Sequence, residues 1–202
     1  MLAEVSTVTR AKIKNPRINI LPVKSPSQME QVYRLHHDNY VALGYHQPED
    51  NGMLNYYKDF DWHEDTQVYS AIIDEQLVGT ISSTVVKKKS DLPLDPCFCK
   101  DAYKLLDECG QFSLIWRLMT KPKVRSNFKV VTKMINAIME HNLSINKVKV
   151  MVCTVHQKHV SFYRRAFGLK LLANYDDIAS LNNVPAAMLR WDIDQCPGQC
   201  RT

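Results

Sequence analysis

The chain lacks the long apolar segments that would place it in or across a membrane. No stretch of its 202 residues approaches the ~20 apolar residues that span a bilayer, and residues 1–17 hold no apolar run of signal-peptide length. Internal repeats and low-complexity tracts are also absent. Apolar residues make up 45% of the chain, a normal fraction for a packed core. The sequence therefore predicts one folded domain in the cytoplasm.

The six cysteines do not form a framework for disulfides or for a structural metal site. They are scattered along a chain without an export signal, so we expect reduced thiols. Zinc is the alternative, but one residue separates Cys97 from Cys99, and Cys196 and Cys200 fall in the expected C-terminal tail. We therefore expect no metal and no bound cofactor.

Positive charge is concentrated in two places. The formal net charge is +5, and much of the excess comes from residues 87–89 and from Lys121, Lys123, Arg125 and Lys129. Such a surface attracts nucleic acids, anionic membranes, phosphates or acidic proteins, and composition alone does not choose among them. Nucleic-acid binding would need aromatic residues interleaved with the basic ones, whereas here they lie largely in different segments.

Hydrophobic periodicity predicts a leader at 1–17, a single α/β domain at 18–193 and a tail at 194–202. Ser27 and Glu30 have the spacing of a capping box at the start of the first helix. The predicted helices are 29–43, 100–108, a third ending near 143, and 156–167. The predicted strands are 18–23, 68–73, 77–86, 112–120, 147–153, 170–175 and 187–192. This order predicts a mixed central sheet with helices on both faces.

Three segments resemble the GNAT acyltransferase superfamily. Residues 118–126 (LMTKPKVRS) look like the family's strand, x-Pro-x-x-Arg turn and helix start. Residues 161–169 (SFYRRAFGL) are similar to its FYxxxGF segment, with one extra residue before the glycine, and 78–80 (VGT) look like its small-residue hairpin strand. The resemblance implies a GNAT-like domain that transfers an acyl group from a pantetheine thioester to an amine.

A narrower resemblance covers roughly residues 30–193. It is to the N-acyl amino acid synthases of the FeeM type, which are relatives of the acyl-homoserine lactone synthases. Members of that group take long acyl chains from acyl carrier protein and transfer them to the amine of an amino acid. The resemblance implies the same reaction here, with an acyl-pantetheine thioester as co-substrate. The segments that carry it are 33–37, 44–45, 59–61, 78–81, 156–159 and 184–192.

The loop before the third helix lacks the glycines with which coenzyme A-dependent GNAT enzymes approach a pyrophosphate. Residues 124–128 read Val-Arg-Ser-Asn-Phe, and bulky side chains crowd the N–H groups that bind phosphates at a helix N-terminus. Carrier protein presents a single phosphate and is acidic, so the loop favours it as the donor. We interpret Lys121, Lys123, Arg125 and Lys129 as a docking patch for carrier protein.

The central strand lacks a carboxylate that the related synthases commonly hold three residues before an arginine. If Arg117 matches that arginine, Leu114 takes the place of the glutamate, and a shifted alignment puts Gln111 there. The sequence therefore identifies no base on this strand. A histidine has a suitable intrinsic pKa for that role. The alternatives for the base are a water molecule, His36, His37, His63 and Glu64.

Amide formation from a thioester needs a neutral amine, a stabilised oxyanion and a thiolate that can leave. We expect the backbone N–H groups of Leu118, Met119 and Thr120 to face the thioester carbonyl. The pantetheine arm would lie beside them like an added strand. Ser126 and Asn127, in the loop that follows, are expected to help bind the donor.

Two side chains are expected to act on the reactants. The resemblance assigns to Tyr163 the role of acid for the departing thiolate, and Arg117 could pair with the carboxylate of the acceptor. Aromatic residues of the irregular segment could cover the substrates. The residues expected to line the acceptor or acyl pocket are Tyr33, Tyr57, Phe60 and Trp62.

Two other functions stay open at this point. One is an N-acetyltransferase that acetylates a small amine from acetyl-coenzyme A, and the glycine-poor loop argues against it. The other is a non-catalytic module that uses the fold to hold an acyl ligand or a partner. The missing strand carboxylate favours that module, whereas Tyr163 and the basic loop favour an enzyme.

Overall fold

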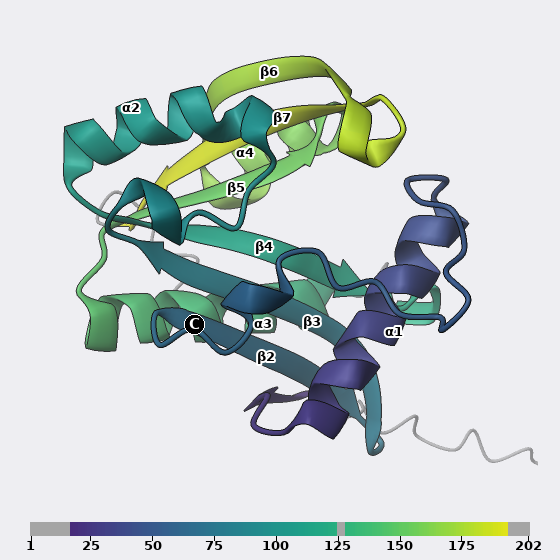
Figure 1. Cartoon of the computed structure of the whole chain (residues 1–202). Coiled ribbons are helices and arrows are strands. Elements are labelled where there is room, and N and C mark those ends of the chain that lie inside the picture. The colour runs from purple at the N-terminus through teal and green to yellow at the C-terminus, as the bar shows by residue number, and fades with distance from the viewer. Residues whose placement is uncertain (1–16, 125–127, 194–202) are drawn as a thin grey trace, which may run out of the picture.

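The structure is a computed structural model that describes residues 17–124 and 128–193 (Figure 1). One seven-stranded sheet has the order β1-β2-β3-β4-β5-β7-β6, and β4 and β5 form its parallel pair. The strands are β1 (Asn19–Pro22), β2 (Thr66–Ile73), β3 (Gln76–Val86), β4 (Phe112–Thr120), β5 (Val150–His156), β6 (Lys170–Ile178) and β7 (Val184–Asp192). The helices are α1 (Pro26–Ala42), α2 (Cys99–Cys109), α3 (Phe128–His141) and α4 (Val160–Phe167). The predicted mixed sheet is confirmed.

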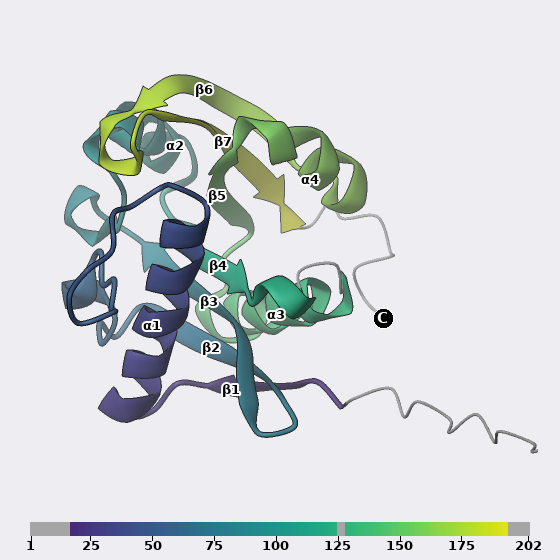
Figure 2. The ribbon, with the colours of Figure 1, turned by 90° about the vertical axis from the view of Figure 1, so that its right-hand side faces the viewer.

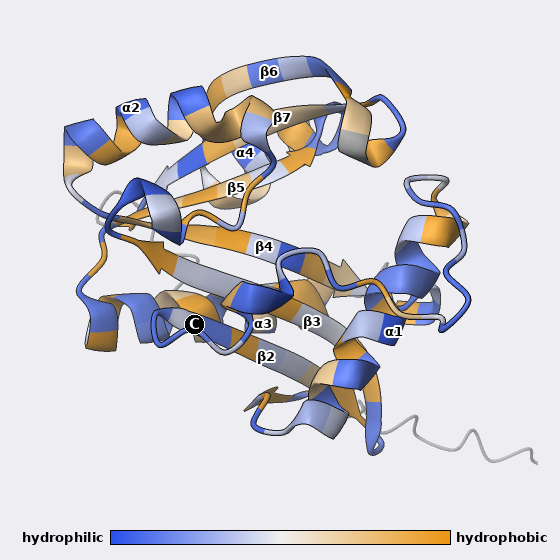
Figure 3. Cartoon of the chain, viewed as in Figure 1, coloured by the Kyte–Doolittle hydropathy of each residue, from blue (hydrophilic) through white to orange (hydrophobic). Residues whose placement is uncertain are grey.

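Helices cover both faces of the sheet. Figures 1 and 2 show α1 and α2 on one face and α3 and α4 on the other. The α3–α4 layer is built on buried residues such as Met134, Ile138 and Phe167, and the α2 layer on residues such as Leu105 and Phe112. β4 and β5 carry mostly apolar residues (Figure 3), because both of their faces lie against helices.

The N-cap of helix α1 lies two residues before the predicted cap. This N-cap is Ser25, whose hydroxyl oxygen accepts a hydrogen bond from the backbone N–H of Gln28 at 3.3 Å. The side chain of Gln28 in turn accepts one from the backbone N–H of Lys24 at 2.7 Å. The prediction of Ser27 and Glu30 as the capping pair is wrong. Pro26 explains the shift, since its fixed φ suits the first position of a helix.

The parallel pair β4–β5 is hydrogen-bonded over only part of its length. Within the described ranges, pairing joins 113–115 of β4 to 151–153 of β5. Both strands continue beyond these residues, β4 to Thr120 and β5 to His156. Figure 1 shows the two ribbons diverging over this stretch. The sheet is therefore open between the carboxyl ends of its two central strands.

A β-bulge in β4 accompanies this opening. On β3, Thr80 faces Met119 and Ser82 faces Trp116, so β4 has one residue more than β3 over the same stretch. Arg117 lies within the bulge and has a left-handed backbone conformation, with φ of 53°. A bulge bends the strand that carries the extra residue, and this one lies just after the last residue of β4 that pairs with β5.

Gly79 allows the neighbouring strand and α3 to pack against this part of β4. A Cβ atom at Gly79 would stand 3.0 Å from the backbone oxygen of Met119 and 3.1 Å from the side-chain methyl of Met134. A side chain there would push on a backbone atom that cannot move aside easily. The small-residue sequence at 78–80 therefore has a steric reason.

Candidate active site

A cavity of about 750 Å³ occupies the opening between β4 and β5, within the usual size range of small-molecule sites. Residues from both faces of the sheet line it. One half lies under α3 and α4 and is bounded by Phe128, Val131, Ile135, Phe162, Tyr163, Phe167 and Trp191. The other half lies beside α1 and is bounded by His36, Asn39, Tyr40, Tyr45, Tyr56, Tyr57, Asp95 and Phe98. We call these the α3–α4 half and the α1 half.

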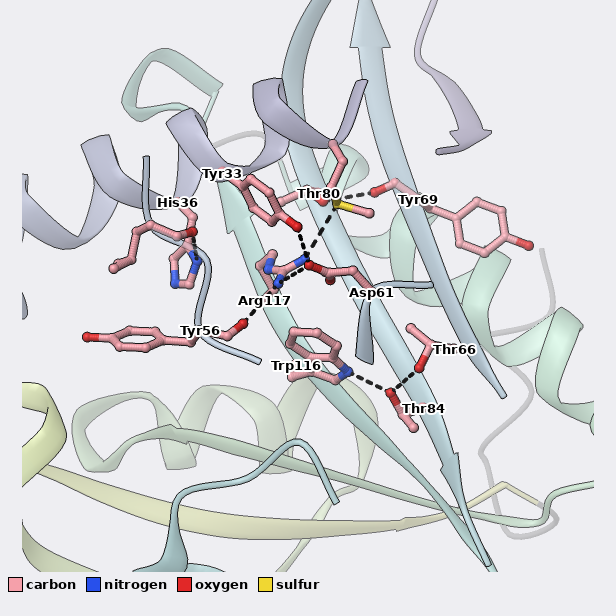
Figure 4. A network of polar contacts seen from close by, with 12 residues as sticks. Tyr33, His36, Tyr56, Asp61, Thr66, Tyr69, Thr80, Thr84, Trp116 and Arg117 are labelled. Atoms are coloured by element: carbon pink, nitrogen blue, oxygen red, sulfur yellow. Dashed lines mark hydrogen bonds and ion pairs between the residues drawn. The ribbon is translucent and has the colours of Figure 1, made fainter. Parts of the chain in front are cut away.

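A buried ion pair stands behind the α1 half. The two terminal nitrogens of Arg117 contact the two carboxylate oxygens of Asp61, Nη1 at 2.7 Å and Nη2 at 3.3 Å. Both side chains are fully buried. The hydroxyl of Tyr33 donates to the same carboxylate at 2.6 Å, and Nη2 also donates to the backbone oxygen of Tyr56 at 3.4 Å. Figure 4 shows this group gathered beneath α1.

This pair bears on the expected role of Arg117. Its guanidinium already has a two-pronged carboxylate partner within the chain, so the carboxylate of an acceptor would have to compete with Asp61. The sequence placed Asp61 in the 59–61 segment that carries the family resemblance but did not predict its pairing with Arg117, 56 residues away. The geometry makes Arg117 and Asp61 a fixed support for the bulge in β4 and for Tyr56.

His36 is the histidine of α1 that faces the cavity. Its side chain is buried, with 3% exposed, and its Nδ1 lies 3.1 Å from the backbone oxygen of Leu54. Burial, together with the positive charge of Arg117, holds the pKa of His36 well below its ordinary value. The other candidate bases do not line the cavity. His37 accepts a hydrogen bond from the backbone N–H of Glu49, at 3.0 Å.

The remaining candidates lie on the segment that carries Asp61. His63 accepts a hydrogen bond from the backbone N–H of Asp65 at 3.2 Å, and Glu64 is exposed. Neither residue borders the cavity.

Tyr163, the expected acid, lines the α3–α4 half. Its ring is half-buried and stacks on Phe167, with centroids 6.0 Å apart. Burial, and then the neighbouring Cys153 thiol, raise the pKa of Tyr163 above its ordinary value. The hydroxyl is therefore protonated at neutral pH.

The expected donor-binding residues of β4 border the cavity. Leu118, Met119 and Thr120 all line it. The N–H of Lys121 bonds to the backbone oxygen of Val78 on β3 at 2.8 Å. Because backbone groups alternate along a strand, the N–H of Thr120 points away from β3, toward the opening. Ser126 and Asn127 lie outside the described residues.

Of the four aromatic residues expected in the pocket, Tyr57 lines the cavity. The other three do not line it, contrary to the expectation. Tyr33 donates a hydrogen bond to Asp61 of the ion pair, and Phe60 and Trp62 lie outside the cavity wall. Trp62 is 54% exposed. Phe60 and Trp62 belong to a short irregular segment whose side-chain directions follow no period. The sequence therefore could not tell which of its aromatic side chains face the cavity.

Three of the four basic residues expected to dock a carrier protein belong to the described residues and lie close in sequence to Thr120 and Phe128, which line the cavity. Lys121 is half-buried at the end of β4, and Lys123 and Lys129 are exposed. Arg125 lies outside the described residues.

The described residues contain neither a cluster of metal ligands nor a membrane-spanning helix. In residues 17–124 and 128–193 no three His, Cys, Asp or Glu side chains gather where they could hold a metal ion. Over the same residues, no helix is long and apolar enough to cross a membrane. The four cysteines in the described part of the chain, Cys97, Cys99, Cys109 and Cys153, are free thiols.

Comparison with known families gives one match over most of the chain. The family described as "N-acyl amino acid synthase FeeM" matches residues 31–192. This range contains the bulge, the cavity and all of the ion-pair residues. A search of curated proteins finds no match.

Solved structures share the fold. The chain is similar to FeeM, an N-acyl amino acid synthase from uncultured soil microbes, at 17% identity and a TM-score of 0.75, over 89% of this chain and 93% of that one. It is also similar to Arabidopsis thaliana NAA60 in complex with acetyl-CoA, at 15% identity and a TM-score of 0.62, over 88% of this chain and 99% of that one. A third similar structure is BjaI, a CoA-dependent acyl-homoserine lactone synthase, at 16% identity and a TM-score of 0.56, over 89% of this chain and 86% of that one. These likenesses confirm the GNAT-like fold.

Proposed function

Because the chain belongs to the FeeM family of N-acyl amino acid synthases and is an acyltransferase, we propose that it transfers a long-chain acyl group from acyl carrier protein to the amine of an amino acid. The product is an N-acyl amino acid. The observation that carries this proposal is the cavity that connects the two faces of the sheet between β4 and β5. A donor can enter from one face and an acceptor from the other.

The α3–α4 half suits the donor. Its wall is apolar and aromatic, and Phe128 and Phe162 lie at its edge with ring centroids 5.7 Å apart. A pantetheine arm can lie along the unpaired edge of β4, with backbone N–H groups as hydrogen-bond donors. The exposed Lys123 and Lys129 near this end favour an acidic carrier protein over a nucleotide.

The α1 half suits an acceptor with an apolar or aromatic group. Four tyrosines line it: Tyr40, Tyr45, Tyr56 and Tyr57. In the described part of the chain, two basic residues border the cavity, Arg117 and Lys158. Lys158 is exposed. Its ammonium group can pair with the carboxylate of an amino acid without displacing Asp61.

The reaction then follows from these positions. The amine attacks the thioester carbon, a C–N bond forms and the C–S bond breaks. A backbone N–H at the opened edge of β4, such as that of Thr120, stabilises the oxyanion. Tyr163, which is protonated at neutral pH, gives a proton to the departing thiolate.

Donor and acceptor choice tests the proposal directly. Purified protein is incubated with hexadecanoyl carrier protein or acetyl-coenzyme A, together with either the amino acids or their decarboxylated amines, and new amides are identified by mass spectrometry. We expect long-chain N-acyl amino acids from the carrier protein alone. Acetylated products would identify an acetyltransferase, products from the decarboxylated amines alone would exclude an amino-acid acceptor, and no product at all would favour a binding module.

A further inference from the structure

The cavity wall contains buried polar atoms without a partner. In the described part of the chain, four buried side-chain nitrogen or oxygen atoms make no hydrogen bond: His36 Nε2, Ser82 Oγ, Arg117 Nε and Trp191 Nε1. Three of these four residues line the cavity, Ser82 being the exception. Leaving a buried polar group unpaired costs free energy, so such atoms usually have a ligand, water or catalytic role to explain them.

Of the unpartnered atoms in these three cavity-lining residues, only one can receive a proton. The Nε atoms of arginine and tryptophan are hydrogen-bond donors without a free lone pair. Nδ1 of His36 faces the carbonyl oxygen of Leu54, which can only accept, so Nδ1 carries the ring hydrogen. Nε2 of His36 is then the unprotonated nitrogen, and its lone pair has no hydrogen-bond partner in the described structure.

The surroundings of His36 keep the ring neutral and fixed. Burial and the positive charge of Arg117 on β4 disfavour the imidazolium, and His37 and His46 add to this effect whenever they are protonated. Tyr40 and Tyr56 pack edge-on against the ring, with centroids 4.3 Å and 5.7 Å away. Figure 4 shows Tyr56 beside His36. The hydrogen bond to the carbonyl oxygen of Leu54 raises the pKa of His36, but burial, which lowers it, is the larger effect.

We propose that His36 is a catalytic residue whose Nε2 accepts a hydrogen bond from the attacking amine and takes the proton that the amine loses. This inference rests on the proposed function. The amine arrives neutral, and as the C–N bond forms one proton passes to Nε2. The thiolate takes a proton from Tyr163, and the imidazolium, unstable beside Arg117, returns its proton through water to the tyrosinate. The site thus gains no net proton per turnover.

The test compares His36→Asn with His37→Asn, the same change at the next residue of α1. Asparagine keeps a donor near the place of Nδ1 and removes Nε2. With hexadecanoyl carrier protein and phenylalanine, we expect kcat of His36→Asn to fall about 100-fold, a typical contribution of a general base. The value for His37→Asn should stay within about threefold of the wild type.

A pH series separates a catalytic role from a structural one. If Nε2 takes the proton, hydroxide replaces it at high pH, so the deficit of His36→Asn should shrink between pH 7 and pH 9. A deficit that is constant over this range, or activity equal to that of His37→Asn, would overturn the proposal.

A second measurement does not depend on turnover. In wild-type protein labelled with 15N-histidine, His36 should show the neutral Nδ1–H form from pH 5.5 to 8, and phenylalanine should shift its Nε2 resonance. A protonated ring, or a resonance that phenylalanine leaves unchanged, would overturn the assignment of His36. Absence of product with every donor would instead overturn the proposed reaction, while this resonance still reports whether His36 meets the amine.

Discussion

At the scale of single residues, the chemistry depends on side chains that are held in one protonation state. Tyr163 and His36 line opposite halves of one cavity, and burial moves both pKa values away from neutrality. Burial raises the pKa of the tyrosine, so it keeps its proton, and lowers the pKa of the histidine, so it stays unprotonated. A low-dielectric wall thus prepares an acid on one side and a base on the other.

Tyr163 gives the first prediction at this scale. Replacing it by phenylalanine keeps the stacking on Phe167 but removes the acidic hydroxyl. We expect turnover to fall about 10-fold or more, the low side of a general acid's contribution, when the released thiol is measured. Tyr103→Phe on α2, outside the cavity, is the control. Wild-type rates for Tyr163→Phe would make this tyrosine a packing residue.

Asp61 gives the second prediction at the scale of single residues. Asp61→Asn leaves the buried guanidinium of Arg117 without its charge partner, and breaking such a pair from one side costs about 3–5 kcal/mol. Urea unfolding measures the loss. Asp59→Asn, an exposed position two residues earlier, should change the free energy of unfolding by less than about 0.5 kcal/mol. Equal stability of the two variants would show that the ion pair does not support the fold.

At the scale of elements, the site depends on how β4 departs from regular pairing. Its first half pairs with both neighbours, its pairing with β5 ends at Ile115, and the bulge at Arg117 lies in the stretch whose edge toward β5 is unpaired. Such an unpaired edge inside a sheet would normally bind another strand. Here it borders the cavity, which is the place for the extended pantetheine arm of a donor.

Gly79 tests this arrangement. In Gly79→Ala the added methyl meets the backbone oxygen of Met119, which lies just after the bulge. We expect a loss of about 1–3 kcal/mol in urea unfolding, the usual cost of overpacking. Shortening Met134 in the same variant should restore little stability, because the tighter contact is with a backbone atom. Unchanged stability of Gly79→Ala would mean that β3 and β4 can separate freely here.

The basic turn between β4 and α3 tests the choice of donor. Charge reversal at Lys123 and Arg125 should weaken binding of carrier protein at ~50 mM salt, where exposed charges are little screened. The same reversal at Lys88 and Lys89, in the other basic cluster, is the matched control. Affinities that respond equally in both variants would point to general charge, and an unchanged affinity at Lys123 and Arg125 would remove the docking patch.

At the scale of the whole molecule, a buried neutral histidine links the site to stability. The pKa of His36 is lowered in the folded state, and an unfolded histidine titrates near 6.5. Below that pH the unfolded chain binds more protons than the folded one, so stability falls as pH falls. Burial also lowers the pKa values of His141 and His156, which adds to the same trend.

We therefore expect the free energy of unfolding to decrease from pH 6.5 downward, with His36 contributing a slope of up to about 1.4 kcal/mol per pH unit. Urea unfolding of the wild type and of His36→Asn between pH 7.5 and 4.5 measures it. The variant should lose less stability than the wild type over this range. Parallel curves would mean that His36 titrates alike in both states.

The sequence by itself determined the elements and the family. β4 was predicted residue for residue at 112–120, because its length, apolar composition and flanking turns are local properties. The segments at 118–126 and 161–169 pointed to the GNAT fold, which the family match and the solved structures confirm. The start of α1 was predicted less well, because Pro26 occupies the first helical position and makes Ser25, not Ser27, the N-cap.

The tertiary structure decided which side chains meet. The bulge at Arg117, its pairing with Asp61, and the choice of His36 over His37 depend on segments that are distant in sequence. No periodicity fixes side-chain directions in the irregular segment 45–64, so the sequence placed Phe60 and Trp62 in the pocket and did not predict that Asp61 pairs with Arg117. Burial and contact direction are properties of the folded chain, and they set the pKa values and open lone pairs on which catalysis depends.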